Sequence, residues 1–248
     1  MPSEVHGRGW RRPAALMAGL FCLWAAAGSP LADLDHQLLI AHMAQHLLLM
    51  TVAAPLILYS LPLILYSLPR GLVVQSPGVL RLGRTITHPV FCWLASTAVV
   101  IGYHIPAVFE MGMRSEAAHA GEHACFFAAG LLFWWPVVQP WPSLARWPRW
   151  SIPLYLFLAT LPCDALSAFL TFCDRVVYPE YLSAHRLFDI PPLADQEAAG
   201  ALMWVWVTFA YLAPAAIIAI QMLSPEGGAS VRKIGPAYSR ADPSLRSG

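Results

Sequence analysis

The stretch HMAQH, from His42 to His46, lies inside an apolar run that extends from about Leu38 to Leu68. Residues four apart in an α-helix lie on one face, one turn above the other. The pattern therefore predicts that His42 and His46 project together from one side of a helix. The run is long enough to cross a membrane, which takes about 20 residues. Because ionisable side chains are costly inside a membrane, such a pair indicates a functional site.

The composition indicates a membrane protein. Of the 248 residues, 58% are hydrophobic and 12% are charged, whereas soluble domains carry about 25% charged residues. We therefore expect the lipid bilayer as a partner. The net charge of +1, with no basic-aromatic patch and no glycine-rich phosphate loop, argues against nucleic acid. The five cysteines form no CxxC motif, so we expect them to be small apolar packing residues rather than a disulfide framework.

The hydropathy pattern predicts an all-α transmembrane bundle of about six spans. The first apolar segment, Ala14–Ala27, is short, so residues 1–32 are either a first helix or a cleaved signal peptide that leaves five spans. The second span lies in Leu38–Leu68, where the segment Leu56–Pro62 is duplicated as Leu63–Pro69 and Pro62 predicts a kink or a helix end. The remaining spans are about Pro89–Phe109, His119–Val138, Ile152–Phe172 and Ala199–Leu223.

The charges of the loops predict the orientation. With the N-terminus in the cytoplasm, all but three of the 15 lysines and arginines lie on the cytoplasmic side, as the positive-inside rule requires. This places the C-terminus in the cytoplasm as well. The chain then divides into an N-terminal segment (1–32), a transmembrane helix-bundle domain (33–223) and a disordered cytoplasmic tail (224–248).

This topology places five histidines at one depth near the outer membrane face. His42 and His46 lie in the outer half of their helix, and His104 lies about one turn from the outer end of the next. His119 and His123 begin the following helix as a second pair four residues apart. Imidazoles on facing helices can ligate copper, zinc or iron. We therefore predict a metal or haem site formed by these five residues.

Further polar residues and one methionine lie near this layer. Asp164 occupies the outer half of its helix, and Asp195 and Gln196 precede the last span. Such groups can orient ligating histidines by accepting hydrogen bonds from them, although acidic residues at a helix start also act as caps. Met203 lies at a similar depth, and thioethers favour Cu(I). Glu122 lies between the two histidines of its helix and is expected to face differently from them.

Eight short motifs follow one another along residues 36–223: His42–Met50, Ala54–Leu56, His104–Ala107, His119–His123, Gly130–Pro136, Phe169–Phe172, Tyr178–Tyr181 and Leu193–Trp204. This order resembles the CtaG family of multi-span cytochrome c oxidase assembly factors, which is associated with caa-type oxidases. Two features depart from the family pattern. The duplicated segment replaces a simpler helix end, and the N-terminus looks short.

The resemblance implies a multi-pass assembly factor of the cell membrane that holds or delivers copper through the histidine layer. Its expected partner is a cytochrome c oxidase subunit, and ligand exchange requires no enzymatic activity. Two alternatives remain open: a haem-binding membrane redox protein, and a copper transporter. A transporter should carry polar residues on toward the inner face, but the inner halves of the histidine-bearing helices are almost wholly apolar. The sequence leaves the oligomeric state undetermined.

Overall fold

The computed structural model describes residues 10–29, 32–67, 83, 85–139, 148–183 and 189–224. Within these ranges the regular elements are all helical, which confirms the predicted all-α class. The described ranges leave out most of the basic residues from which the orientation was predicted. They also leave out the end of the duplicated segment and residues 225–248. The orientation and the disordered tail therefore stay predictions.

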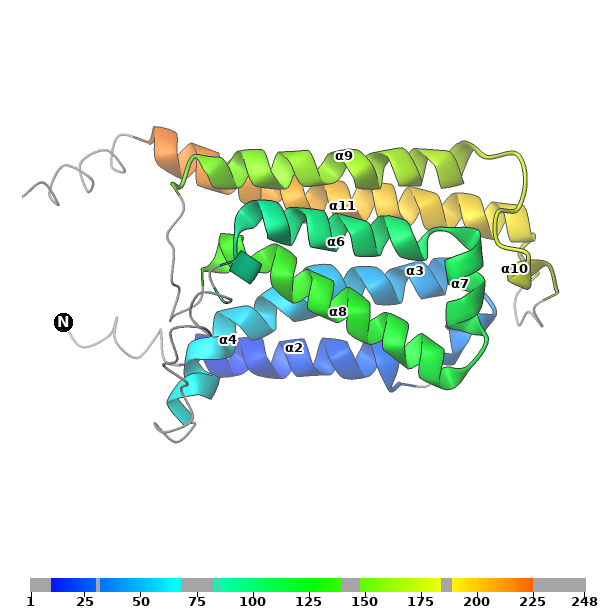
Figure 1. Cartoon of the computed structure of the whole chain (residues 1–248), viewed down its shortest axis with the longest axis horizontal. Helices are drawn as coiled ribbons and strands as arrows, with labels where there is room; N and C mark the ends of the chain where they lie inside the picture. Colours follow the sequence, from blue (N-terminus) through cyan, green and yellow to red (C-terminus); the bar gives the residue numbers. More distant parts are fainter. Residues whose placement is uncertain are drawn as a thin grey trace, which may run out of the picture.

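The helices follow one another in this order: α2 (Arg11–Ala27), η1 (Ala32–His36), α3 (Leu39–Leu48), η2 (Leu49–Ala53), α4 (Ala54–Ser67), α6 (Pro89–Tyr103), α7 (Pro106–Met113), α8 (Glu116–Val138), α9 (Ser151–Phe172), α10 (Glu180–Ser183) and α11 (Pro192–Leu223). Figure 1 shows the long helices running side by side, with the short helices α7 and α10 at one end of the bundle. We call this the α7 end; α3 and α11 begin there.

Within the described ranges, three helical segments are long and apolar enough to cross a membrane: Leu39–Pro62, Ser151–Phe172 and Pro192–Leu223. The helices α6 and α7 qualify only as a pair bent by 77°, which gives up to four spans. Each of the six predicted spans contains a helix, but α2 has only 17 residues and the first half of α8 carries ionisable side chains. Among the described residues, length and apolarity therefore support three or four spans, and the number of about six, or five without the N-terminal segment, stays a prediction.

The outward faces of the long helices are apolar. Large side chains such as Phe91 on α6, Phe157 and Phe169 on α9, and Phe209 and Ile220 on α11 are exposed. Soluble monomers rarely expose contiguous apolar surface of this kind. The exposed faces therefore fit a hydrocarbon environment, in agreement with the spans found by length.

The third predicted span ends earlier than expected. Helix α6 ends at Tyr103, and Ile105 adopts an extended backbone (φ −70°, ψ 123°) before α7 begins at Pro106. Proline disfavours helical backbone in the residue before it, so a continuous helix through Phe109 was a wrong prediction. The bend carries α7 across the end of the bundle and buries Phe109 against the ring of His42, with 4.9 Å between the ring centroids.

Of the two outcomes predicted at Pro62, a kink or a helix end, the helix end is wrong. Helix α4 continues through Pro62 to Ser67. Proline removes one backbone hydrogen bond, but its fixed φ is compatible with a helix. The packing of α4 against α2 and α8 outweighs the lost bond. On the α2 side this packing is close, because a Cβ at Gly19 would lie 2.8 Å from Ile57.

A π-helical turn, η2, interrupts the histidine-bearing helix directly after α3 and is held by its neighbours. The indole Nε1 of Trp134 on α8 donates to the Met50 carbonyl at 3.0 Å, and that of Trp206 on α11 donates to Thr51 Oγ1 at 2.8 Å. Gly130 allows α8 to approach this closely, because a Cβ there would lie 2.7 Å from the Met50 oxygen. The turn is thus fixed by contacts from both sides.

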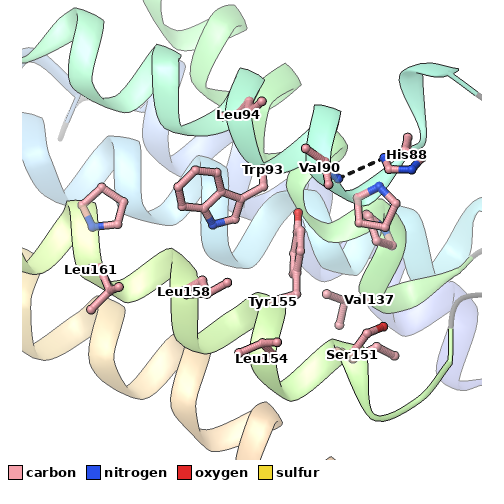
Figure 2. A pocket seen from close by; sticks show the side chains of 14 residues that line it. His88, Val90, Trp93, Leu94, Val137, Ser151, Leu154, Tyr155, Leu158 and Leu161 are labelled. Atoms are coloured by element: carbon pink, nitrogen blue, oxygen red, sulfur yellow. Dashed lines mark hydrogen bonds between the residues drawn. The ribbon is translucent and has the colours of Figure 1, made fainter.

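An apolar groove of about 520 Å³ opens between α6, α9 and the end of α8 (Figure 2). Trp93, Tyr155 and Leu158 are among its lining residues, and the Tyr155 hydroxyl donates to the Phe133 carbonyl at 2.8 Å. His88 lies at one end of the groove. His88 lies directly before the start of α6, and α7 follows the end of α6. This groove therefore reaches the end of the bundle opposite the α7 end.

Candidate metal centre

Helix α3 presents two buried histidines on one face, as their spacing predicts. His42 and His46 are both buried, and their ring centroids lie 4.3 Å apart. The helix begins after Leu38, whose backbone is extended and whose side chain gives no cap. Asp195 of α11 supplies the cap instead, because its carboxylate accepts hydrogen bonds from the Leu39 and Ile40 N–H groups at 2.8 and 3.1 Å.

The carboxylate of Glu122 completes the first group of possible ligands. Its Oε1 lies 3.4 Å from His42 Nε2 and 3.6 Å from His46 Nε2. The expectation that Glu122 faces differently from the histidines is wrong, because a residue three positions after His119 is its neighbour on the helix surface. Glu122 is fully buried, and neither of its oxygens has a hydrogen-bond partner within the described residues.

A second group shares His42 with the first. Asp35 of η1 places its Oδ2 3.1 Å from His119 Nε2. The ligand atoms of Asp35, His42 and His119 lie within 4.8 Å of one another, as do those of His42, His46 and Glu122. Both ring nitrogens of His42 are buried without a hydrogen-bond partner in the described part of the chain. Each group therefore brings two imidazole nitrogens and one carboxylate oxygen close enough together to hold one ion.

His123 brings the histidine pair of α8 into contact with α3. Its Nε2 lies 3.0 Å from Nε2 of His119 and 3.2 Å from Oε1 of Gln45. The ring centroids are 5.4 Å apart for His42 and His119 and 5.5 Å apart for His46 and His123. Four of the five predicted histidines thus form one cluster between α3 and α8.

His104 lies beside this cluster but outside both ligand groups. Its Nδ1 is 2.6 Å from the Val100 carbonyl oxygen, so this nitrogen carries the hydrogen and donates it. Its Nε2 is buried without a hydrogen-bond partner among the described residues. His104 lines a cavity of about 30 Å³ together with His46 and Met203. Met203 thus shares a cavity with two of the predicted histidines.

Two of the predicted orienting residues, Asp195 and Gln196, make hydrogen bonds with backbone groups. Asp195 caps α3 and so fixes the helix that carries His42. Gln196 accepts from the Val177 N–H at 2.7 Å and donates to the Arg175 carbonyl at 3.1 Å, which ties α11 to the segment after α9. Asp164 on α9 has a buried Oδ1 without a hydrogen-bond partner in the described residues and belongs to neither ligand group.

Replacing Asp195 with Ala should destabilise the α7 end of the bundle. The change would leave the Leu39 and Ile40 N–H groups without their acceptor, and loss of such a cap costs about 1–2 kcal/mol. We expect a lower unfolding temperature and weaker metal binding together. Asp195→Asn, which retains one acceptor oxygen, should lose less of both. Equal unfolding temperatures for the unaltered chain and Asp195→Ala would contradict the capping role.

The donor set fits a transition-metal ion. Two imidazoles and one carboxylate in each group are ligands for copper, zinc or iron. A buried carboxylate without hydrogen-bond donors is unfavourable, and a bound cation would remove that penalty. Sequence reasoning missed Asp35, Gln45 and Glu122 as parts of this cluster. Of these three, Glu122 gave the clearest signal, as an ionisable residue three positions after His119 in a predicted membrane span.

Comparison with known proteins gives one match. A family model described as cytochrome c oxidase caa3 assembly factor matches residues 3–224. This extends the similarity predicted for residues 36–223 to the N-terminal helix. No curated protein and no solved structure matches the chain significantly.

Proposed function

Because the chain belongs to the cytochrome c oxidase caa3 assembly factor family, we propose that it holds a copper ion in the buried cluster and passes it to an oxidase subunit. The observation that carries the proposal is the pair of buried ligand groups that share His42. Six nitrogen and oxygen atoms of these groups lack a hydrogen-bond partner within the described residues: Asp35 Oδ1, both ring nitrogens of His42, His46 Nε2 and both oxygens of Glu122. A bound cation would supply the missing partner. Passing the ion on requires ligand exchange and no catalysis.

The geometry favours an ion over haem. Neighbouring imidazoles of the cluster are in contact, with ring centroids 4.3 Å apart for His119 and His123 as well as for the α3 pair. The cavity beside His46 and His104 measures about 30 Å³, whereas pockets that bind drug-sized ligands measure about 300–1,000 Å³. The purified protein should therefore show no Soret band in its absorption spectrum. A Soret band that is lost on replacement of His104 would favour the haem alternative.

The core beyond the cluster favours holding an ion over transporting one through the bundle. Toward the other end, the interior is filled by apolar side chains such as Phe133, Leu156 and Val207. Buried hydroxyls there are bonded to backbone carbonyls: Ser96 donates to Ala129 at 2.9 Å and Thr160 donates to Phe157 at 2.9 Å. An ion in the cluster would therefore enter and leave at the α7 end.

The direct test measures metal in the full-length chain purified in detergent. We expect copper to bind with high affinity, in preference to zinc and iron, and to move to a copper-free oxidase subunit on mixing. Mass analysis of the separated proteins gives both quantities. A chain that takes up no copper, or that keeps its copper in the presence of the subunit, would contradict the proposal.

A glycine on α7 offers a substitution that disturbs the cluster without removing a ligand. A Cβ at Gly112 would overlap Oε2 of Glu122. Gly112→Ala should therefore displace the carboxylate and weaken copper binding roughly 10- to 100-fold, as for other changes in the residues that orient ligands. The matched control is Gly121→Ala, because among the described residues no atom beyond the adjoining residues and backbone of its own helix lies within 4 Å of a Cβ there. Equal affinities for the two variants would contradict the placement of Glu122.

A further inference from the structure

A polar cleft of about 150 Å³ leads from the surface of the α7 end to the buried cluster. Its rim is exposed and is formed by Asp33, His36 and Glu116. Its deeper wall includes Asp35 and His119, which belong to one of the two ligand groups, and His123. The cleft therefore connects the surface directly with ligand atoms of the candidate metal centre.

The side chains that line the cleft are of the kinds that bind cations. Three carboxylates and three imidazoles line it, and no lysine or arginine is among its lining residues in the described part of the chain. The Asp35 side chain is 95% buried, and its Oδ1 has no hydrogen-bond partner within the described residues. His36 Nε2 lies 3.7 Å from this oxygen. Since a water molecule takes up about 30 Å³, the cleft has room for a partly hydrated ion.

We propose that this cleft is the port through which the copper ion enters and leaves. We also propose that the ion occupies two successive positions in the cluster. This inference rests on the proposed copper function. Asp35, His119 and His42 hold the ion first, next to the port. The bonds to Asp35 and His119 are then exchanged for bonds to His46 and Glu122, while the bond to His42 is kept. A shared ligand makes this transfer possible without release of the ion.

The test compares the rate of copper uptake with the amount bound at equilibrium. The full-length chain is placed in lipid nanodiscs, and Cu(I) is supplied from a coloured chelator whose absorbance reports its loss. The double variant Asp33→Asn/Glu116→Gln removes two rim charges but no proposed ligand. We expect it to bind as much copper as the unaltered chain but to take it up roughly tenfold more slowly at low salt, because charged clefts speed association by such factors. Higher salt should reduce this difference.

The matched control is Glu110→Gln/Asp174→Asn. Both of these carboxylates are exposed and neither lines the cleft. Slow uptake by the rim variant with normal uptake by the control supports the port. Equal uptake rates for the rim variant, the control and the unaltered chain, with normal copper content in all three, would overturn the port alone. No uptake by the unaltered chain would overturn the proposed function and the port together.

Discussion

Replacing His42 with Ala is expected to abolish tight copper binding, with a loss of affinity of at least about 100-fold. His42 is the ligand common to both groups, so its removal leaves each group with only two ligands. His46→Ala and His119→Ala each disrupt a single group and leave the other intact. We therefore expect the order of effects to place His42→Ala first, with the two other variants retaining measurable binding. Competition with a Cu(I) chelator of known affinity measures all three.

The control for His42→Ala is His88→Ala, which removes an exposed imidazole at the opposite end of the bundle. Its copper content and affinity should equal those of the unaltered chain. The ring of His42 also packs against Phe109, so the unfolding temperature of each variant without copper must be measured as well. An affinity for His42→Ala equal to or above that of His46→Ala would show that His42 is not the shared ligand.

Replacing Glu122 with Gln should separate metal binding from stability. The substitution keeps the shape of the side chain and removes a buried carboxylate that lacks hydrogen-bond donors. Because an unpaired buried charge is unfavourable, we expect the copper-free variant to unfold at the same temperature as the unaltered chain or a higher one. Its copper affinity should nevertheless fall steeply, since a neutral amide is a poor substitute for the carboxylate.

Thermal unfolding with and without copper measures both effects in one experiment. Copper at 100 times its dissociation constant should stabilise the unaltered chain by about 2.7 kcal/mol. Glu122→Gln should lose most of this stabilisation at the same copper concentration. The opposite result, in which the variant unfolds early without copper but is stabilised normally by it, would assign Glu122 a structural role and leave the two histidines without an acidic ligand.

Helix periodicity was sufficient to identify both histidine pairs. His42 with His46 and His119 with His123 follow from the spacing of four residues, and the ordered motifs were sufficient to indicate the family that the match over residues 3–224 confirms. The same periodicity places Glu122 beside His119, because Glu122 follows it by three residues. Glu122 lies between the two histidines in the sequence and still shares their side of the helix, because residues i and i+3 are neighbours on a helix surface.

The ends of the helices depended on packing as well as on local sequence. Pro106 ends α6 before its apolar run does, whereas Pro62 lies inside α4. Proline thus coincides with a helix end at one position and with an uninterrupted helix at the other. Around Pro62 the packing of α4 against α2 and α8 holds the helix together, and sequence alone does not reveal which neighbours a proline will have.

The sequence by itself determined an apolar helical chain with histidines in two pairs on neighbouring helices, because helical spacing and hydropathy are local properties of the chain. The tertiary structure decided which acidic groups meet those histidines. Asp35 reaches His119 from the turn before α3, and Asp195 caps α3 from a position 156 residues away. Such contacts depend on how distant segments pack in three dimensions, and no spacing along the chain encodes them.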